Sequence, residues 1–181
     1  MSQPIQKMFT EVPQTYRLLN HLLTLGQDIF WRRRAAKIAA SGGGTRWLDA
    51  CSDTGEMAAY LSHLATDGTS IVAADFSLSM MSKAMEKPEA KHIAFTLADV
   101  SRLPFRDNSF DVITISLATR NLNISQDNLL KCLREFHRVL KPSGPILFGL
   151  NQIYAMTNRI EYTWLPGESF LFLLNRIKIV K

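Results

Sequence analysis

Short β-rich segments and helical patterns alternate along most of the chain, and this alternation constrains the fold more than any other feature of the sequence. The β-rich segments lie at 46–50, 70–74, 92–97, 112–117 and 146–150. Apolar residues at helical spacing fill intervals between them, among them Met57, Leu61 and Leu64, and then Leu129, Leu133, Phe136 and Leu140. Strands and helices in regular turn predict an α/β fold: a doubly wound, mostly parallel sheet with helices on both faces.

A further helical pattern precedes the first strand. Apolar residues recur at helical spacing from about residue 13, Gly26 interrupts the pattern, and it resumes until the run SGGG at 41–44 stops it. We therefore expect residues 1–41 to form an N-terminal helical cap on an α/β unit of residues 42–181. The chain has 181 residues, of which 46% are hydrophobic and 20% charged, and this composition suits a single domain overall.

The composition also indicates the cellular compartment of the protein and the role of its cysteines. The sequence contains no apolar run long enough to cross a bilayer, and its first residues lack the apolar centre of a secretory signal, so we expect a cytoplasmic protein. Cys51 and Cys132 have no CxxC or Cys/His partner, which favours two core residues over a metal or redox site. No metal is expected.

The net charge of +5 is concentrated in two clusters, Arg32–Arg33–Arg34 with Lys37, and Arg176 with Lys178 and Lys181. Such clusters suit contact with phosphate or with an anionic membrane surface, so peripheral membrane association is one interpretation. A solvated helix face is the simpler one. Aromatic residues do not interleave with the cations, so we expect no nucleic-acid partner.

Polar residues follow four of the predicted strands at the points where those strands end. They are Asp49 with the turn at 53–55, then Asp75, Asp99 and Ser116. Ligands of open parallel sheets bind outside the carboxyl ends of the strands, so these residues are expected to line one crevice. An acid at the end of the second strand suits the two hydroxyls of a ribose, and Asp99 suits an exocyclic adenine amine. Backbone amides after Gly55 would face an anionic group.

Each of these residues also has a purely structural interpretation. Asp75, followed by Ser77, is typical of helix capping, and Asp49 and Asp99 are common turn formers. Convergence on one crevice favours a ligand site, because capping does not predict it. Gly55 is the only glycine of the turn, which argues against a dinucleotide such as NAD.

Two longer stretches carry a more specific signal. The stretch YRLLNHLLTLGQDIFWRR, from residue 16, and the stretch LPFRDNSFDVITISLATRNL, from residue 103, lie on either side of the strand-end acids. With these stretches the chain resembles the ubiquinone/menaquinone biosynthesis C-methyltransferase family, over about residues 8–150. The family is a branch of the class I methyltransferases, which have a Rossmann-like sheet and use S-adenosyl-L-methionine.

The resemblance implies a role for particular positions. S-adenosyl-L-methionine would be the cofactor, with Thr54 and Gly55 along its methionine part, and Asp49 is placed in the same cofactor-binding set. Asp75 would hold the ribose, and Asp99 and Val100 would flank the adenine. Ser116 would close the floor of the pocket.

The resemblance also implies a substrate and a catalytic pair. Arg120 and Asn121 fall where the family has an Arg-Asn pair facing the substrate, a quinol ring with a polyprenyl tail. Carbon methylation requires loss of a ring proton, so Arg120 is expected to act through a water or to stabilise a phenolate. The alternative is a surface or ion-pairing arginine. A homodimer or membership of a quinone-synthesis complex is a further expectation.

The chain departs from the family pattern in three places. Asp53 stands where the family has a glycine, Ser143 replaces another glycine, and the C-terminal part is shortened. The shortening predicts truncated C-terminal strands, with the tail at 170–181 as one more strand or as an interfacial amphipathic piece. Asp53 and the short end also support a second hypothesis, a catalytically inactive subunit or scaffold that has lost cofactor binding.

Overall fold

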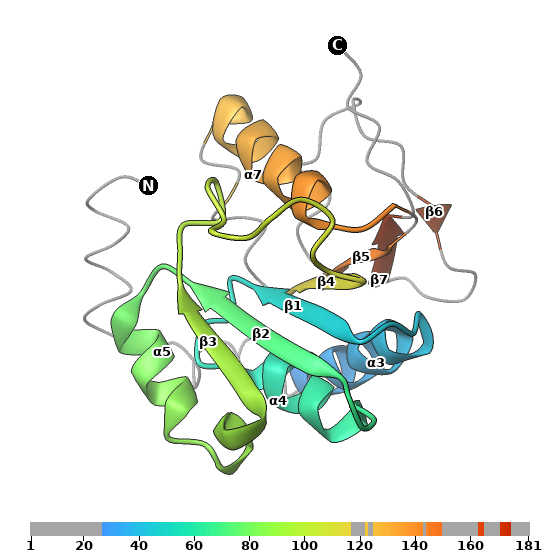
Figure 1. The fold of residues 1–181 in the computed structure, drawn as a ribbon, viewed down its shortest axis with the longest axis vertical. Coiled ribbons are helices and arrows are strands. Elements are labelled where there is room, and N and C mark those ends of the chain that lie inside the picture. Colours follow the sequence, from blue (N-terminus) through green and yellow to red (C-terminus); the bar gives the residue numbers. More distant parts are fainter. Residues whose placement is uncertain are drawn as a thin grey trace.

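The computed structural model describes residues 27–116, 122, 125–142, 144–149, 163–164 and 171–174. They form a seven-stranded sheet in the order β3-β2-β1-β4-β5-β7-β6 (Figure 1). The strands are β1 Arg46–Ala50, β2 Ser70–Asp75, β3 Ile93–Leu97, β4 Val112–Ile115, β5 Ile146–Gly149, β6 Thr163–Trp164 and β7 Leu171–Leu174. Strands β1 to β5 pair with one another in parallel, which confirms the predicted sheet.

Helices cover both faces of this sheet, as the alternation of patterns predicts (Figure 1). They are α3 Gln27–Ser41, α4 Glu56–Leu64, α5 Leu78–Met85, the short 3₁₀ helix η1 Pro88–His92, and α7 Gln126–Val139. Helix α7 packs on one face, where Leu133 and Phe136 meet Leu48 and Ile113. Helices α3 and α4 pack together on the other face, around Trp47. Strands buried on both faces explain the nearly unbroken apolar runs of the sequence.

Serine caps set where two of the helices begin. Ser77 accepts a hydrogen bond from the Met80 N–H at the start of α5, and Ser125 accepts one from the Asn128 N–H at the start of α7. Helix α4 begins differently: its N-cap is Gly55, in the left-handed conformation, and the cap has no side-chain hydrogen bond. The start of α4 therefore depends on the preceding turn.

Two further strands come after β5 in the sequence. Strand β7 pairs antiparallel with β5, and β6 pairs antiparallel with β7. Within the tail at 170–181, which was expected to be a strand or an amphipathic piece, residues Leu171–Leu174 form a strand, and the other residues of the tail lie outside the described residues. The parallel part of the sheet thus has an antiparallel neighbour at its β5 edge, where an unpaired strand would present free backbone groups.

The expected N-terminal cap is described in part. Helix α3 covers its last segment, and residues 1–26 lie outside the described residues. The division at residue 41 remains a prediction. Within the part of the chain that the structure describes, no helix has the length and apolar character needed to cross a bilayer.

Candidate cofactor site

The residues predicted at the strand ends lie along one edge of the sheet. Strands β3, β2, β1 and β4 are neighbours in that order, and their pairing aligns Asp75 with Leu97 and Ala50 with both Ala74 and Ile115. Asp99, Asp75, the turn after Ala50 and Ser116 therefore follow one another along the carboxyl edge. The topology brings together residues that are far apart in the sequence, as expected from a parallel sheet.

Asp49 is the most buried of these residues. Its side chain is fully buried in β1, where its carboxylate accepts hydrogen bonds from Ser52 Oγ at 2.6 Å and Thr114 Oγ1 at 2.9 Å. Burial raises the pKa of Asp49 to about 6, although both hydroxyl donors lower it. The Asp49 carboxylate therefore links the turn after β1 to the neighbouring strand β4. This contact agrees with the structural interpretation of Asp49 as a turn former.

The turn itself has an unusual backbone. Cys51 and Asp53 both have φ of 55°, in the left-handed region, and Gly55 has φ of 78°. The Asp53 N–H donates to Asp75 Oδ2 at 2.9 Å, so the turn is attached to the end of β2. Asp53 Oδ1 is buried and has no hydrogen-bond partner among the residues that the structure describes. Burial, and then repulsion from Asp75 and Glu56, raises the pKa of Asp53 to about 7.

The backbone at position 55 has two features that favour glycine over any other residue. Its φ is positive, and a Cβ at this position would lie 2.8 Å from the Cβ of Ala84 in α5. Gly55 therefore lets α4 begin close against α5. Next to it, the Thr54 hydroxyl donates to Glu56 Oε2 at 2.5 Å, and Lys87 forms an ion pair with Glu56 Oε1 at 2.8 Å. These bonds position the first turn of α4.

Asp75 has both the structural contacts and the capacity for a ligand. Its Oδ1 accepts the Ser77 N–H at 2.8 Å and its Oδ2 accepts the Asp53 N–H. Burial raises the pKa of this carboxyl, and those backbone donors lower it. A carboxylate has about four acceptor positions. These two amides and the backbone of Phe76, which also lowers the pKa, use up to three of them, so at least one acceptor position remains for a ribose hydroxyl.

Asp99 and Val100 differ in their surroundings. Asp99 is partly exposed and accepts the Ser101 N–H at 2.9 Å, and this donor lowers the pKa of its carboxyl although burial raises it. The side chain of Val100 is buried in the core beneath α7. Asp99 thus remains an ionised acceptor, whereas Val100 packs in the core, and its place beside an adenine stays a prediction.

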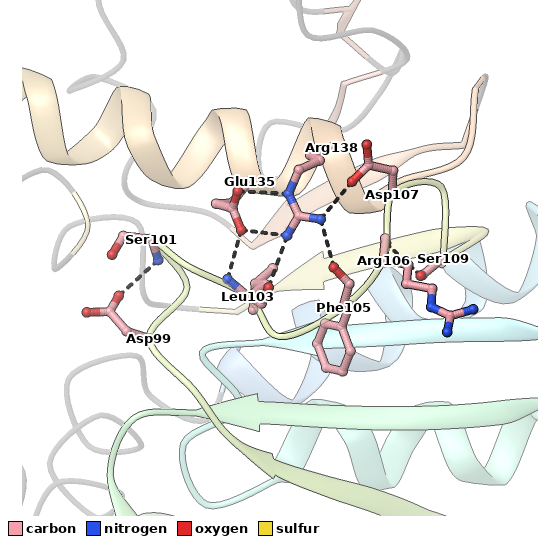
Figure 2. A network of polar contacts seen from close by, with 9 residues as sticks. All are labelled: Asp99, Ser101, Leu103, Phe105, Arg106, Asp107, Ser109, Glu135 and Arg138. Carbon is pink, nitrogen blue, oxygen red and sulfur yellow. Dashed lines mark hydrogen bonds and ion pairs between the residues drawn. The ribbon is translucent and has the colours of Figure 1, made fainter.

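The segment after Asp99 is held in place by a side chain that the sequence reading did not select. Arg138 of α7 donates to the carbonyl oxygens of Leu103 at 3.0 Å and Phe105 at 2.7 Å, and it pairs with Asp107 and Glu135 (Figure 2). Glu135 in turn accepts the Leu103 N–H at 2.8 Å. The network fixes the LPFRDNSFD stretch against α7. In the sequence, this network could have been suspected only from the spacing of Glu135 and Arg138, since an Arg and a Glu three positions apart on a helix can form an ion pair.

Arg32 is the second residue that the sequence reading left outside the site, since it was grouped with a solvated basic cluster. Its Nε donates to Ser116 Oγ at 3.2 Å, across the end of β4. The stretch FWRRR gives no direct signal for this, because helical periodicity does not show which of three consecutive arginines points toward the sheet. The predicted catalytic pair, Arg120 and Asn121, lies outside the described residues.

Comparison with known proteins identifies the family of the chain. The family model of the ubiE/COQ5 methyltransferase family matches residues 1–163. The chain belongs to this family. That membership confirms the resemblance identified from the sequence.

Individual relatives agree with this assignment. A demethylmenaquinone methyltransferase of Thermus thermophilus is 39% identical over 142 residues, 77% of this chain and 62% of the relative. The ubiquinone/menaquinone biosynthesis C-methyltransferase UbiE of Shewanella frigidimarina is 33% identical over 147 residues, 79% of this chain and 57% of the relative. The chain thus spans about three fifths of the length of these relatives.

Solved structures support the fold. A TehB-like S-adenosyl-L-methionine-dependent methyltransferase from Corynebacterium glutamicum aligns with a TM-score of 0.63, over 88% of this chain and 94% of that one, at 19% identity. At this identity the likeness concerns the fold alone. The chain therefore has the Rossmann-like class I methyltransferase fold.

Proposed function

We propose that this family member is an S-adenosyl-L-methionine-dependent C-methyltransferase that acts on a quinol precursor in ubiquinone/menaquinone biosynthesis. The main support is the line of Asp99, Asp75, the turn after β1 and Ser116 along the carboxyl edge of the sheet. Family membership and the names of the relatives support the reaction and the substrate class.

The residues at the edge suit each part of this cofactor. Asp75 retains acceptor capacity for a ribose hydroxyl, and ionised Asp99 accepts a hydrogen bond from the adenine amine. Thr54, Gly55 and the start of α4 would lie along the methionine part. The Asp49 carboxylate holds this turn in place through its hydrogen bonds with Ser52 and Thr114. The bound cofactor would supply an electrophilic methyl group.

The acceptor side of the reaction is assigned to Arg120 and Asn121. A positive guanidinium beside the ring stabilises a developing phenolate, which makes a ring carbon more nucleophilic and eases loss of its proton. Alignment of that carbon with the methyl donor accounts for a further part of the rate. A quinol with a polyprenyl tail suggests peripheral contact with a membrane and a cytoplasmic location, and a homodimer or a quinone-synthesis complex remains part of the proposal.

Methyl transfer itself is the direct test. The purified chain is incubated with S-adenosyl-L-methionine and a reduced, short-tailed demethylmenaquinol, and the products are analysed by mass spectrometry. We expect a product heavier by one methylene unit, together with S-adenosyl-L-homocysteine. Absence of both methylated product and cofactor binding would instead favour the inactive subunit or scaffold that has lost cofactor binding.

A further inference from the structure

Asp53 has a backbone conformation and surroundings that are costly for an aspartate. Its φ of 55° lies in the left-handed region, which residues with a side chain adopt at a cost. Its Oδ1 atom is buried, and no group in the described part of the chain forms a hydrogen bond with it. Buried polar atoms without a partner are rare, and residues held in sparsely populated conformations cluster at functional sites. Both features point to a role of Asp53 in the candidate cofactor site.

The charges that act on Asp53 come from the end of β2, from α3 and from α4. Burial, and then repulsion from Asp75 and Glu56, raises the pKa of the Asp53 carboxyl to about 7. The positive charge of Arg32 and a hydrogen bond from the Thr54 backbone lower it. Because the net effect is an increase, the chain does not fully compensate the negative charge of the Asp53 carboxylate. A positive charge on a ligand would therefore stabilise the ionised form.

The hydrogen bonds of the turn place Asp53 between the proposed ribose and methionine parts of the site. The Asp53 N–H donates to Asp75 Oδ2 at 2.9 Å, and Asp75 is the proposed ribose ligand. Thr54 and Gly55, which are proposed to lie along the methionine part, follow directly in the sequence. In S-adenosyl-L-methionine, the positive sulfonium joins these two parts. A sulfonium has no N–H or O–H group, so it interacts with a buried carboxylate through charge rather than through a hydrogen bond.

We propose that the Asp53 carboxylate makes the site prefer the positive sulfonium of S-adenosyl-L-methionine to the neutral sulfur of S-adenosyl-L-homocysteine, an inference that rests on the proposed function. The two ligands share adenine, ribose and the amino-acid end, so the charge at sulfur distinguishes them. Opposite charges attract more strongly in a buried site than in water. Asp53 is thus a specificity-determining residue, and it favours exchange of the demethylated product for a new methyl donor.

The ratio of the two affinities tests this role. S-adenosyl-L-methionine and S-adenosyl-L-homocysteine are titrated calorimetrically into the full chain and into Asp53→Asn at pH 8. Asparagine has nearly the same shape and also tolerates a positive φ, but it has no charge. We expect the preference for S-adenosyl-L-methionine to fall at least tenfold in the variant, about 1.4 kcal/mol. The affinity for S-adenosyl-L-homocysteine should stay within a factor of about three.

The pH dependence of the same ratio is a second readout. The Asp53 carboxyl, with a pKa of about 7, becomes charged between about pH 6 and pH 8, so the preference of the unaltered chain for S-adenosyl-L-methionine should rise over this range. The amino-acid end is common to both ligands, so its titration cancels in the ratio. Asp49 has a raised pKa of about 6 and that of Asp75 is also raised, so their titration would persist in Asp53→Asn. A rise that is lost in this variant therefore belongs to Asp53.

Two further variants complete the experiment. Asp67→Asn removes a charge from the exposed loop before β2 and should leave the ratio unchanged. Asp53→Gly, which also suits the positive φ, should lose the preference as Asp53→Asn does. It carries the test if Asp53→Asn does not fold, as judged by circular dichroism.

The outcomes distinguish this inference from the proposed function. An unchanged ratio in a folded Asp53 variant, or equal weakening of both ligands, would overturn the role of Asp53 and leave the proposed function standing. An unaltered chain that binds neither ligand would overturn the proposed function and the inference with it.

Discussion

At the scale of single residues, Asp75 joins the turn after β1 to the end of β2 and is also the proposed ribose ligand. Asp75→Ala should weaken S-adenosyl-L-homocysteine binding at least tenfold, because charge-assisted hydrogen bonds of about 1.5 to 3 kcal/mol are lost. Calorimetric titration measures the change. Asp67→Ala, an exposed change in the loop before β2, is the control. Alanine also leaves the backbone N–H groups of Asp53 and Ser77 without their acceptor, so the affinity of Asp75→Asn is measured as well. Unchanged affinity in both variants would mean that Asp75 has only a structural, helix-capping role.

Asp53 stands where the family pattern has a glycine, and burial raises the pKa of its carboxyl to about 7. A carboxyl whose pKa is higher in the folded than in the unfolded chain favours folding while it is protonated. Its contribution to the free energy of unfolding therefore falls as the pH rises from about 4 to about 7. Asp49, with a raised pKa of about 6, acts in the same direction.

Asp53→Gly should therefore reduce the loss of stability between pH 5 and pH 8. The variant removes the buried carboxyl and also suits the positive φ at this position, so we expect it to be more stable than the parent at pH 8 by about 1 kcal/mol or more. Denaturant unfolding at a series of pH values tests this. A parallel pH dependence in both proteins would show that Asp53 does not titrate as described.

At the scale of elements, the close approach of α4 to α5 depends on Gly55. Gly55→Ala should lower the free energy of unfolding by about 1 kcal/mol for the positive φ and by about 1 to 3 kcal/mol more for the clash with Ala84. Gly68→Ala separates the two effects, because Gly68 has φ of 85° and open space around its Cβ position. Equal losses in the two variants, measured by urea unfolding, would mean that helix packing does not require Gly55.

The attachment of the 99–110 segment to α7 is a second feature at this scale (Figure 2). Arg138→Ala should lower the free energy of unfolding by about 2 kcal/mol, because two carbonyl groups and Glu135 lose their charged donor. The pair with Asp107 adds little, since the Asp107 side chain is 71% exposed. Arg134→Ala, at an exposed position one turn earlier, should change stability by less than about 0.5 kcal/mol. Similar losses in the two variants would contradict a special role for Arg138.

At the scale of the whole molecule, the proposed reaction needs a cofactor side, built on the edge of the sheet, and an acceptor side around residues 120 and 121. Arg120→Ala should lower turnover on a quinol by tenfold or more while leaving the affinity for S-adenosyl-L-homocysteine within a factor of two. Turnover is measured by methyl transfer and affinity by calorimetry. A matching loss of cofactor affinity would remove Arg120 from the acceptor side.

The sequence by itself determined the succession of strands and helices along the chain and the polar residues that follow the strand ends. Residue periodicity reports local structure, and a parallel sheet necessarily gathers its strand ends at one edge. For that reason Asp75 and Asp99 could be selected before any coordinates, and Gly55 could be recognised as the start of a helix.

Only the tertiary structure decided which side chains meet across long sequence distances. It turns Arg32 to Ser116, attaches Arg138 to the segment after β3, and encloses Asp49 between two hydroxyl groups. It also pairs β7 with β5 and β6 with β7. These contacts depend on how distant segments pack together. The spacing of residues along one segment predicts its local structure but does not indicate which other segment it will contact.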